Sequence, residues 1–574
     1  MKKVLLSMSL ILALPLVAMA GPRSLEEMKA AASKVIPVAK TRSSANAADG
    51  LKVLKTVPQL TVLGYENGGY AVIANDDRFP AVLGYSDSKL SNGDNPGLQW
   101  WMNAMSEALA AQAAGETKAA TRVIPDGLKS EVPGLMTTKW GQSAPYYNMC
   151  PTYISSSTGA STHYLTGCVA TAISQIMYYH KWPETGEGYS SYTFTDANGK
   201  VQSLEADYDR AHYDYANMLP VYEEGKYTLI QANAVATLMA HVGISVEMNY
   251  QVGASGALHN VACLSLRNYF RYNDNIKMYM RDYYPQQEWM DIVYRELSDG
   301  CPVLYGGQAE EFGGHSFVID GYDADGLVRV NWGWEGSDDG FYDISLLNPP
   351  SANYNSFLSQ NMVVVRPETD ERYNPGYFSM WSLTRALEMG TDGSQLTFSQ
   401  ISAANLDVES FYGDILLVAE NMSTGDRTVL RTLNSYSASR AVEYGEIEFF
   451  GQKDPVSVEA LADGEYRIFV ASQSPLEATM QPMRSHETVN NSYILTKSGS
   501  TLSLTAENNP NWTATTGISG VEVGDNTGDG IVRVYDMSGR MVYSAPAAGF
   551  SVADVPAEGV LIIKNGSQVK KVIK

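Results

Sequence analysis

A cysteine stands at the predicted start of a helix in the stretch 166–183, which reads T-G-C-V-A-T-A-I-S-Q-I-M-Y-Y-H-K-W-P. Behind Cys168, apolar side chains recur at helical spacing, and Pro183 ends the pattern. Free N–H groups and the helix dipole at such a position favour a thiolate, while Gly167 leaves room for another backbone or a substrate. The stretch therefore predicts a nucleophile. The alternative is a buried cysteine that acts as a small apolar residue.

The first residues have the pattern of an export signal. Lys2 and Lys3 precede an apolar run over 4–17, and the small-x-small site ends at Ala20. We expect residues 1–20 to be a signal peptide and the mature chain to start at Gly21. No later apolar run reaches the roughly 18 residues that a membrane helix needs. The expected location is therefore outside the cytoplasm, either secreted or associated with the outer membrane.

Charge and cysteine content exclude several classes of protein. The 574 residues carry 63 acidic and 41 basic side chains without a basic cluster, which argues against nucleic acid as a partner. The four cysteines are too few for a disulfide framework in a chain of this length, so we expect no disulfide. They are Cys150, Cys168, Cys263 and Cys301. We expect no cofactor and no metal.

In the middle segment, 131–367, predicted helices come first and predicted strands follow. Helical periodicity predicts helices at 229–243, 258–270 and 287–297, and short β-rich runs follow at 302–305, 316–320, 327–331 and 340–344. Helices followed by strands of an antiparallel sheet predict an α+β domain. The Gly/Ser-containing loop 248–257 is a candidate wall for a substrate pocket.

The flanking segments have patterns of their own. Residues 21–130 begin with hairpin signals at 60–65 and 70–75 and continue with a predicted helix at 100–114. The polar stretch 115–129 lacks periodicity, and we interpret it as an exposed linker open to proteolysis. Beyond 367 the chain is rich in strands and turns, which predicts a β-sandwich-like domain at 368–506 and a small β-unit at 518–574.

A cysteine nucleophile needs a base, and one histidine has a distinctive placement. His315 follows two glycines, Gly313 and Gly314, and opens a predicted strand 147 residues after Cys168 (315 minus 168). Papain-like enzymes place histidine roughly 130 to 150 residues after cysteine. The other six histidines have no framing motif, and we expect them to be structural or solvated. They are His163, His180, His212, His241, His259 and His486.

Three further residues complete a candidate site. Asn331 ends the strand that returns from the turn at 323–326, so its amide oxygen is placed to accept the N–H of the His315 imidazole while Trp332 shields the bond. The alternative is a turn asparagine beside a core tryptophan. Gln142 is a candidate N–H donor to the oxyanion, together with the backbone N–H of Cys168. Alone, a loop glutamine is more often simply solvated.

Several of these motifs together resemble the streptopain family of papain-fold cysteine peptidases. The matching runs are W-G-Q-S-A-P-Y, the stretch 166–183, V-G-I-S-V-E-M-N-Y, G-G-H-S-F-V-I-D-G-Y and V-N-W-G-W-E-G. The resemblance implies that Cys168 is the nucleophile, His315 the base, Gln142 the oxyanion donor, and Asn331 with Trp332 the orienting pair. Gly167 and Gly314 are then expected to border the bound substrate.

The same resemblance extends to the flanking segments. It implies that 68–85 belongs to an inhibitory prodomain at 21–130, so that the chain is a zymogen whose partners are its own prodomain and protein or peptide substrates. The tail after 367 resembles β-domains of exported proteins of Bacteroidetes-type bacteria. Its last segment is similar to sorting domains, which implies a contact with export machinery.

Two other function classes remain open. Another Cys-His acyl-transfer enzyme, such as an amidase or transglutaminase, usually pairs histidine with aspartate, so Asn331 and Gln142 weigh against it. A non-catalytic adhesion or inhibitor protein has no need of Cys168. A secreted cysteine endopeptidase explains more of these residues than either alternative.

Overall fold

The chain is described by a computed structural model, which covers residues 21–36, 50–91, 93–114, 122–274, 276–309, 313–347 and 360–370 of its first two thirds. In the last third it covers 379–399, 401–408, 410–438, 447–449, 455–475, 477, 480–485, 489–507 and the strands within 531–573. The predicted signal peptide, 1–20, lies outside the described residues. Within them, no helix is both long and apolar enough to cross a membrane.

The N-terminal segment consists of two helices and a four-stranded meander. The elements are α1 (Leu25–Val35), β1 (Lys52–Val57), β2 (Leu60–Gly64), β3 (Tyr70–Ala74), β4 (Val82–Ser86) and α2 (Pro96–Ala114). Ser24 and Glu27 form a capping box at the start of α1, which satisfies free N–H groups of its first turn. The strands β2 and β3 are buried along their whole length, with α1 packed against them.

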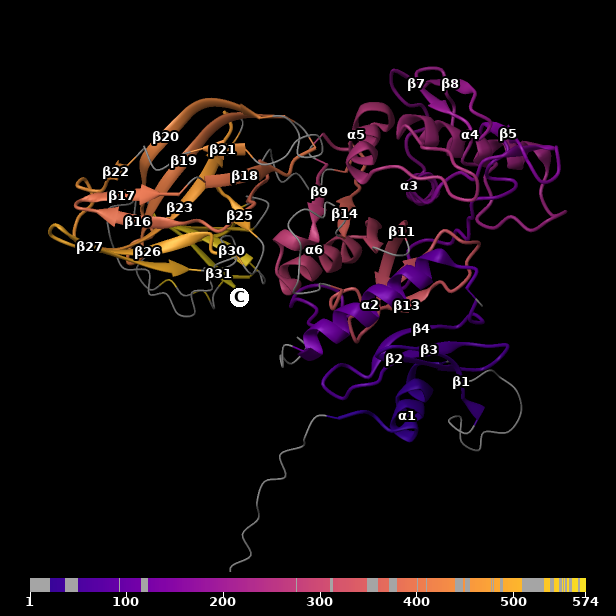
Figure 1. Cartoon of the computed structure of the whole chain (residues 1–574), viewed down its shortest axis with the longest axis horizontal. Coiled ribbons are helices and arrows are strands. Elements are labelled where there is room, and N and C mark those ends of the chain that lie inside the picture. Colours follow the sequence, from indigo (N-terminus) through magenta and orange to yellow (C-terminus); the bar gives the residue numbers. More distant parts are fainter. Residues whose placement is uncertain are drawn as a thin grey trace, which may run out of the picture.

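A ten-stranded sheet joins this segment to the middle of the chain. Its order is β1-β2-β3-β4-β13-β12-β11-β10-β14-β9. The strands from the middle of the chain are β9 (Met278–Met280), β10 (Val303–Ala309), β11 (Gly313–Tyr322), β12 (Val328–Asn331), β13 (Gly340–Tyr342) and β14 (Asn361–Val364). The junction is the antiparallel pair β4 and β13, where Tyr85 lies opposite Phe341. The N-terminal segment is therefore an extension of the central sheet (Figure 1).

Helices cover the central strands. The elements outside the sheet are α3 (Cys168–His180), α4 (Leu229–Ser245), α5 (His259–Phe270), the 3-10 helix η2 (Arg281–Tyr283) and α6 (Gln286–Ser298). Two small hairpins, β5 (Thr152–Ile154) with β6 (Ser161–His163) and β7 (Tyr189–Thr195) with β8 (Val201–Asp207), lie outside the central sheet. The helices α2, α3 and α6 all pack against β10 and β11. Helices first and an antiparallel sheet second confirm the predicted α+β fold.

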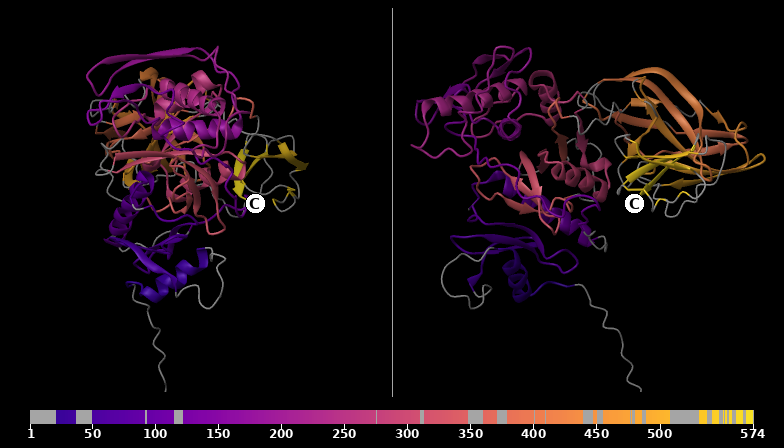
Figure 2. Two further views of the ribbon diagram at one scale, coloured as in Figure 1. Left: turned by 90° about the vertical axis from the view of Figure 1, so that its right-hand side faces the viewer. Right: turned by 180° about the vertical axis from the view of Figure 1, so that it is seen from behind.

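The last third of the described chain is formed by strands alone. They are β15 (Trp381–Leu383), β16 (Met389–Asp392), β17 (Gln395–Phe398), β18 (Ile401–Asn405), β19 (Phe411–Asn421), β20 (Arg427–Ala438), β21 (Ile447–Phe449), β22 (Val456–Ser457), β23 (Gly464–Gln473), β24 (Gln481–Pro482), β25 (Arg484–Ser485), β26 (Ser492–Ser498) and β27 (Thr501–Glu507). Three sheets formed from these strands enclose a separate apolar core around Trp381, Ile415 and Ile468. Seen from behind, this unit lies beside the middle domain, whereas the N-terminal strands lie below the middle domain (Figure 2).

One buried and one half-buried ionic contact join the strand-rich unit to the middle domain. Lys277 bonds Asp407, with both side chains 6% exposed. Arg484 forms an ion pair with Glu288 at 2.6 Å, and its guanidinium lies 3.9 Å from the ring centroid of Tyr284. Apolar residues of the strand-rich unit also join the core of the middle domain. They are Met380, Ala404, Leu406 and Val408.

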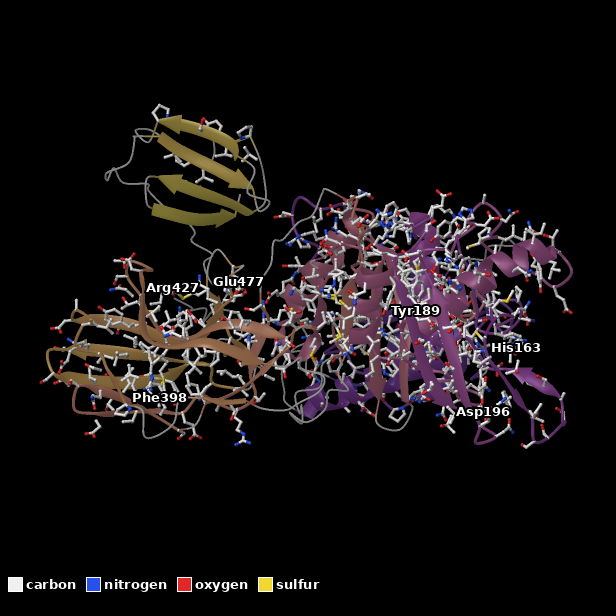
Figure 3. All side chains as sticks on the ribbon, turned by 90° about the horizontal axis from the view of Figure 1, so that it is seen from above. His163, Tyr189, Asp196, Phe398, Arg427 and Glu477 are labelled. Carbon is white, nitrogen blue, oxygen red and sulfur yellow. The ribbon has the colours of Figure 1, made fainter. Side chains whose placement is uncertain are left out.

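The final strands form a separate four-stranded sheet in the order β29-β28-β30-β31. Their bounds are β28 (Ile531–Asp536), β29 (Met541–Pro546), β30 (Val560–Asn565) and β31 (Gln568–Ile573). Seen from above, this sheet stands apart from the unit that carries Phe398, Arg427 and Glu477, while His163, Tyr189 and Asp196 lie in the opposite half of the molecule (Figure 3).

Two features of the fold differ from the sequence-based expectation. The hairpin of β7 and β8 lies in a stretch for which the sequence analysis predicts no element, and most of its side chains are exposed or half-buried. The stretch 115–129 is not wholly an exposed linker. Residues 115–121 lie outside the described part, but Arg122 is 10% exposed and pairs with Asp343 at 3.0 Å. A buried cation requires a partner, so this residue is anchored on the middle domain.

Candidate active site

Cys168 is the first residue of α3, as the sequence predicts. Its neighbour Gly167 is the N-cap with φ of 87°, a conformation that glycine adopts without strain. A Cβ atom on Gly167 would lie 2.7 Å from Sδ of Met248 and 2.9 Å from the carbonyl oxygen of Ser255. The close neighbour that Gly167 admits is therefore the loop 248–257. Helix α3 is buried from Val169 to Met177, which fixes the sulfur at one end of a rigid element.

His315 lies near the start of β11, in register with Gly307 of β10. The side chain is buried, and its Nε2 atom lies 2.9 Å from the carbonyl oxygen of Trp332. No hydrogen bond joins His315 to Cys168 in the part of the chain that the structure describes. The two residues nevertheless line the same cleft, which has a volume of about 530 Å³. The imidazole is thus close to the cysteine but bonded elsewhere.

Among the described residues, the Asn331 side chain does not form the predicted bond to the His315 imidazole but bonds three other groups. The Asn331 Oδ1 atom accepts from Nε2 of Gln175 at 3.1 Å and from the N–H of Gly333 at 3.0 Å, and its Nδ2 donates to the carbonyl of Thr138 at 2.8 Å. All of its polar atoms are therefore occupied by a network that ties α3 to the end of β12. The physical reason is register: Asn331 lies opposite Val318, three residues beyond the histidine.

The acceptor of the His315 imidazole is the backbone carbonyl of Trp332. Its indole is fully buried, with ring centroids 4.9 Å from Phe317 and 5.2 Å from Tyr342. Its N–H donates to Asp339 Oδ1 at 3.0 Å, and its Nε1–H donates to the carbonyl of Asp338 at 3.0 Å. With both donors fixed, the carbonyl of Trp332 is held as a rigid acceptor for His315.

Gln142 and Gly314 both border the cleft that contains Cys168. Gln142 is buried, and its backbone carbonyl accepts from the N–H of Thr166, which ties the loop to the start of α3. The Gln142 side-chain amide has no hydrogen-bond partner among the described residues. It is therefore available to a group bound beside the sulfur. Gly314 is exposed at the mouth of the cleft.

Burial changes the protonation of both members of the cysteine and histidine pair. Burial raises the pKa of the Cys168 thiol, although backbone N–H groups of Ser316, Val169 and Cys168 itself oppose the shift. Burial likewise lowers the pKa of His315 to about 4, with the carbonyl of Trp332 acting in the opposite direction. Burial thus disfavours the charged form of both side chains, while the N–H groups at the start of α3 favour the thiolate.

The N-terminal segment contacts the site directly. Pro96 lines the cleft, and a Cβ atom on Gly97 would lie 2.6 Å from Cδ2 of His315 and 2.6 Å from Cε3 of Trp332. Only a glycine allows the first turn of α2 to approach the imidazole so closely. This contact comes from the segment 21–130, which the sequence predicts to be separate from the middle domain.

The segment that follows Trp332 is also held from the N-terminal side. Its carbonyls at Ser337 and Asp339 accept from Asn95 Nδ2 at 2.8 Å and from Ser86 Oγ at 2.7 Å. Asp338 Oδ1 accepts from the hydroxyl of Tyr70 at 3.1 Å. These bonds fix the backbone that carries the acceptor of the His315 imidazole.

Three residues of the cleft had no signal in the sequence. His259, Ser316 and Asn361 line it together, although His259 was expected to be structural or solvated. They come from the start of α5, from β11 and from β14. Only the position of His259 at the end of the loop 248–257 pointed toward the cleft.

A cysteine at the start of a buried helix that shares a cleft with a histidine on an antiparallel sheet defines a papain-like cysteine peptidase. Comparison with known proteins narrows this class. Residues 140–342 match the Peptidase C10 family. Streptopain of Streptococcus pyogenes is 32% identical over 297 residues, which are 50% of this chain and 74% of that protein. The thiol protease/hemagglutinin PrtT of Porphyromonas gingivalis is 30% identical over 54% of this chain and 37% of its own length.

Two solved structures from Prevotella intermedia are also similar. A prointerpain A fragment is 41% identical, covers 55% of this chain and 97% of the fragment, and has a TM-score of 0.49. Active wild-type interpain A is 40% identical over 42% of this chain and 98% of its own, with a TM-score of 0.38. On the identity and coverage of streptopain, the chain belongs to the Peptidase C10 family. It is a cysteine peptidase of the streptopain type.

Proposed function

We propose that this chain is a secreted cysteine endopeptidase made as an inactive precursor, in which Cys168 is the nucleophile and His315 the base. The observation that carries the proposal is the shared cleft. Cys168, His315 and Gln142 converge on it, and Pro96 of the N-terminal segment occupies its rim. The substrates are proteins or peptides.

The carbonyl of Trp332 accepts the Nε2–H of His315, which orients the ring and makes Nδ1 its basic nitrogen. The imidazole takes the thiol proton, and the thiolate sulfur then forms a bond to the carbonyl carbon of the substrate. The Gln142 amide and the backbone N–H of Cys168 stabilise the oxyanion. The imidazolium gives its proton to the leaving amine, and the C–N bond breaks. Water, deprotonated by His315, then hydrolyses the acyl-enzyme and restores the thiol.

Asn331 and Trp332 act indirectly in this scheme. The Asn331 network with Gln175 fixes the end of β12 against α3, and the buried indole of Trp332 fixes the backbone that follows. They therefore set the distance between the helix that carries Cys168 and the strand that carries His315. Gly314 keeps one side of the cleft open to a peptide backbone, whereas Gly167 makes room for the loop 248–257.

The N-terminal segment supports latency. It extends the central sheet through β4, and α2 places Pro96 at the cleft and Gly97 against the imidazole, so the segment lies where a substrate would approach His315. Cleavage between about 115 and 132 is expected to release activity. Within that interval Arg122 is anchored on Asp343, whereas Val123 and Lys129 are exposed.

The test compares the purified precursor with the mature enzyme on casein, with and without a thiol-alkylating epoxide. We expect the mature enzyme to hydrolyse casein, the epoxide to abolish hydrolysis, and the precursor to be latent. Cys168→Ala removes the thiol that forms the acyl-enzyme, so activity is expected to fall below about a hundredth of the wild type. Hydrolysis by Cys168→Ala above that level would refute the assignment of the nucleophile.

Export is a separate part of the proposal. The pattern at 1–20 supports a signal peptide, and the four-stranded unit β28 to β31 is a compact module suited to recognition by export machinery. We expect the exported chain to begin at Gly21, which N-terminal sequencing checks. Deletion of 518–574 should leave peptidase activity intact and change the location of the protein. An unchanged location would remove the sorting role.

A further inference from the structure

A second histidine forms part of the cleft floor. His259 is the first residue of α5, is 8% exposed and lines the same cleft as Cys168. Its Nε2 atom lies 2.7 Å from Oγ of Ser316, and its Nδ1 atom bonds Oδ1 of Asn361. A Cβ atom on Gly306 would lie 2.6 Å from Cε1 of the ring. The imidazole is therefore locked between α5, β10, β11 and β14.

The hydrogen-bond partners determine the proton positions on this ring. An amide oxygen only accepts, so Nδ1 carries the proton and Nε2 accepts from the Ser316 hydroxyl. Burial lowers the pKa of His259 to about 4, so the ring is neutral at neutral pH. Asn361, His259 and Ser316 form one uncharged polar row along the floor of the cleft.

Two polar groups of the cleft, one in this row and one outside it, lack a hydrogen-bond partner among the described residues. The Ser255 hydroxyl is buried without a hydrogen bond, and the Asn361 N–H₂ group has no partner among the described residues. Ser255 and Asn361 both line the cleft, and no lysine, arginine, aspartate or glutamate does so within the described chain. A buried polar group without a partner is costly, which favours a ligand that supplies one. The missing partner is a neutral group with hydrogen-bonding oxygen.

Resting on the proposed peptidase function, we propose that His259, Ser316 and Asn361 determine specificity. The polar floor selects a peptide that presents a neutral hydrogen-bonding side chain to it, a carboxamide or a hydroxyl. The residues of this class are asparagine, glutamine, serine and threonine. A site that hydrogen-bonds its ligand rejects an apolar analogue because the buried polar groups are then left unpaired. Leucine and valine are expected to be disfavoured at the corresponding substrate position.

The test is a cleavage-site profile of the mature enzyme on a proteome-derived peptide library, read by mass spectrometry. We expect one position near the scissile bond to be enriched in asparagine, glutamine, serine or threonine. His259→Leu should shift that position toward leucine and valine, by roughly tenfold in the ratio of kcat/KM values for matched peptides, and leave other positions unchanged. Asn361→Leu is a second variant, expected to shift the same position.

The control is His212→Leu. His212 is 63% exposed, pairs with Glu184 at 3.6 Å and does not line the cleft, so its profile should match the wild type. A change in a ratio of substrates cannot result from a loss of folded enzyme. A wild-type profile with leucine or valine at every enriched position, or an unchanged profile in both floor variants, overturns the proposal. Failure of the peptidase function itself gives a different result: no cleavage and no epoxide labelling of Cys168.

Discussion

The Nε2 atom of His315 lies 2.9 Å from the carbonyl oxygen of Trp332, so Nε2 carries the ring proton and Nδ1 is the nitrogen that the proposed chemistry needs at Cys168. Helix α2 packs against the same ring at Gly97. Removal of α2 would take away this contact with the ring. Helix α2 and the acceptor of the imidazole thus meet at the proposed base, which several variants can test.

Gly97→Ala is expected to raise the activity of the precursor. The added methyl group meets His315 and Trp332 at 2.6 Å, and such overpacking costs about 1–3 kcal/mol. The equilibrium constant for docking of α2 on the site should therefore fall by roughly 5- to 160-fold. Alanine is also the better helix former, so a lost helix cannot explain the effect. The measurement is casein hydrolysis by uncleaved precursor.

Gly50→Ala is the matched control for this change. It adds a methyl group in the same segment that meets only the ring edge of Tyr65, at 3.2 Å. We expect it to stay latent. Equal latency of the Gly97→Ala and Gly50→Ala precursors would show that α2 does not hold the imidazole.

The precursor should lose stability on acidification through His315. Burial lowers its pKa from 6.5 to about 4, so the unfolded chain binds a proton that the folded chain excludes. The stability is fully present above pH 6.5 and falls as pH decreases toward 4. Asp339 acts in the opposite direction, because burial raises its pKa to about 7 and the folded chain then binds the extra proton.

His315→Gln separates these contributions. Glutamine keeps an N–H donor for the carbonyl of Trp332 but does not titrate, while Asp339 and His259 are unchanged. Thermal unfolding of the Cys168→Ala precursor, with and without His315→Gln, is measured at pH 7.5 and 4.5. The chain that keeps the histidine should lose more stability between the two pH values than the glutamine variant. Parallel losses would mean that the buried imidazole is not the titrating group.

Gln142→Ala is expected to lower kcat of the mature enzyme by about 10² to 10³ with little change in KM. The amide has no protein partner among the described residues, and a bond to the oxyanion strengthens only in the transition state. Gln251→Ala is the control, because Gln251 lines the same cleft from the loop 248–257. A change confined to KM would instead make Gln142 a ground-state contact.

The features that could be predicted from the sequence are those that depend on residues close together in the chain. The helix that starts at Cys168 depends on local signals, the apolar period, Gly167 and Pro183, and the predicted and observed starts agree. The α+β fold follows from the same local periodicities. Catalytic roles for Cys168, His315 and Gln142 stay predictions, which the experiments above address.

Contacts between distant segments could not be predicted in this way. The acceptor of the His315 imidazole depends on α2, which lies in another part of the sequence, and on the register that places Asn331 opposite Val318. His259 gains its position from Ser316 and Asn361, which two separate strands supply. A residue whose partners lie far along the chain has the same local sequence whether it is solvated or forms the floor of a cleft.

The last prediction concerns the strand-rich unit, which we expect to be part of the folded peptidase. Lys277 and Asp407 form a buried ion pair across the boundary, with both side chains 6% exposed. Removing one partner leaves a buried charge, so Lys277→Met should lower the free energy of unfolding by about 3–5 kcal/mol. Replacing both, in Lys277→Met with Asp407→Leu, should restore most of the loss, since apolar side chains of similar volume fill the site.

Urea unfolding of the Cys168→Ala precursor and these variants provides the measurement. Lys497→Met is the control, because its ion pair with Asp463 lies within the strand-rich unit and Asp463 is 62% exposed, so the change should be small. If Lys277→Met is as stable as the parent, the two units are not coupled through this pair. If the pair does couple the stability of the two units, the sequence pattern changes at 367 from helices and strands to strands alone, but the cooperatively folded enzyme continues beyond that point.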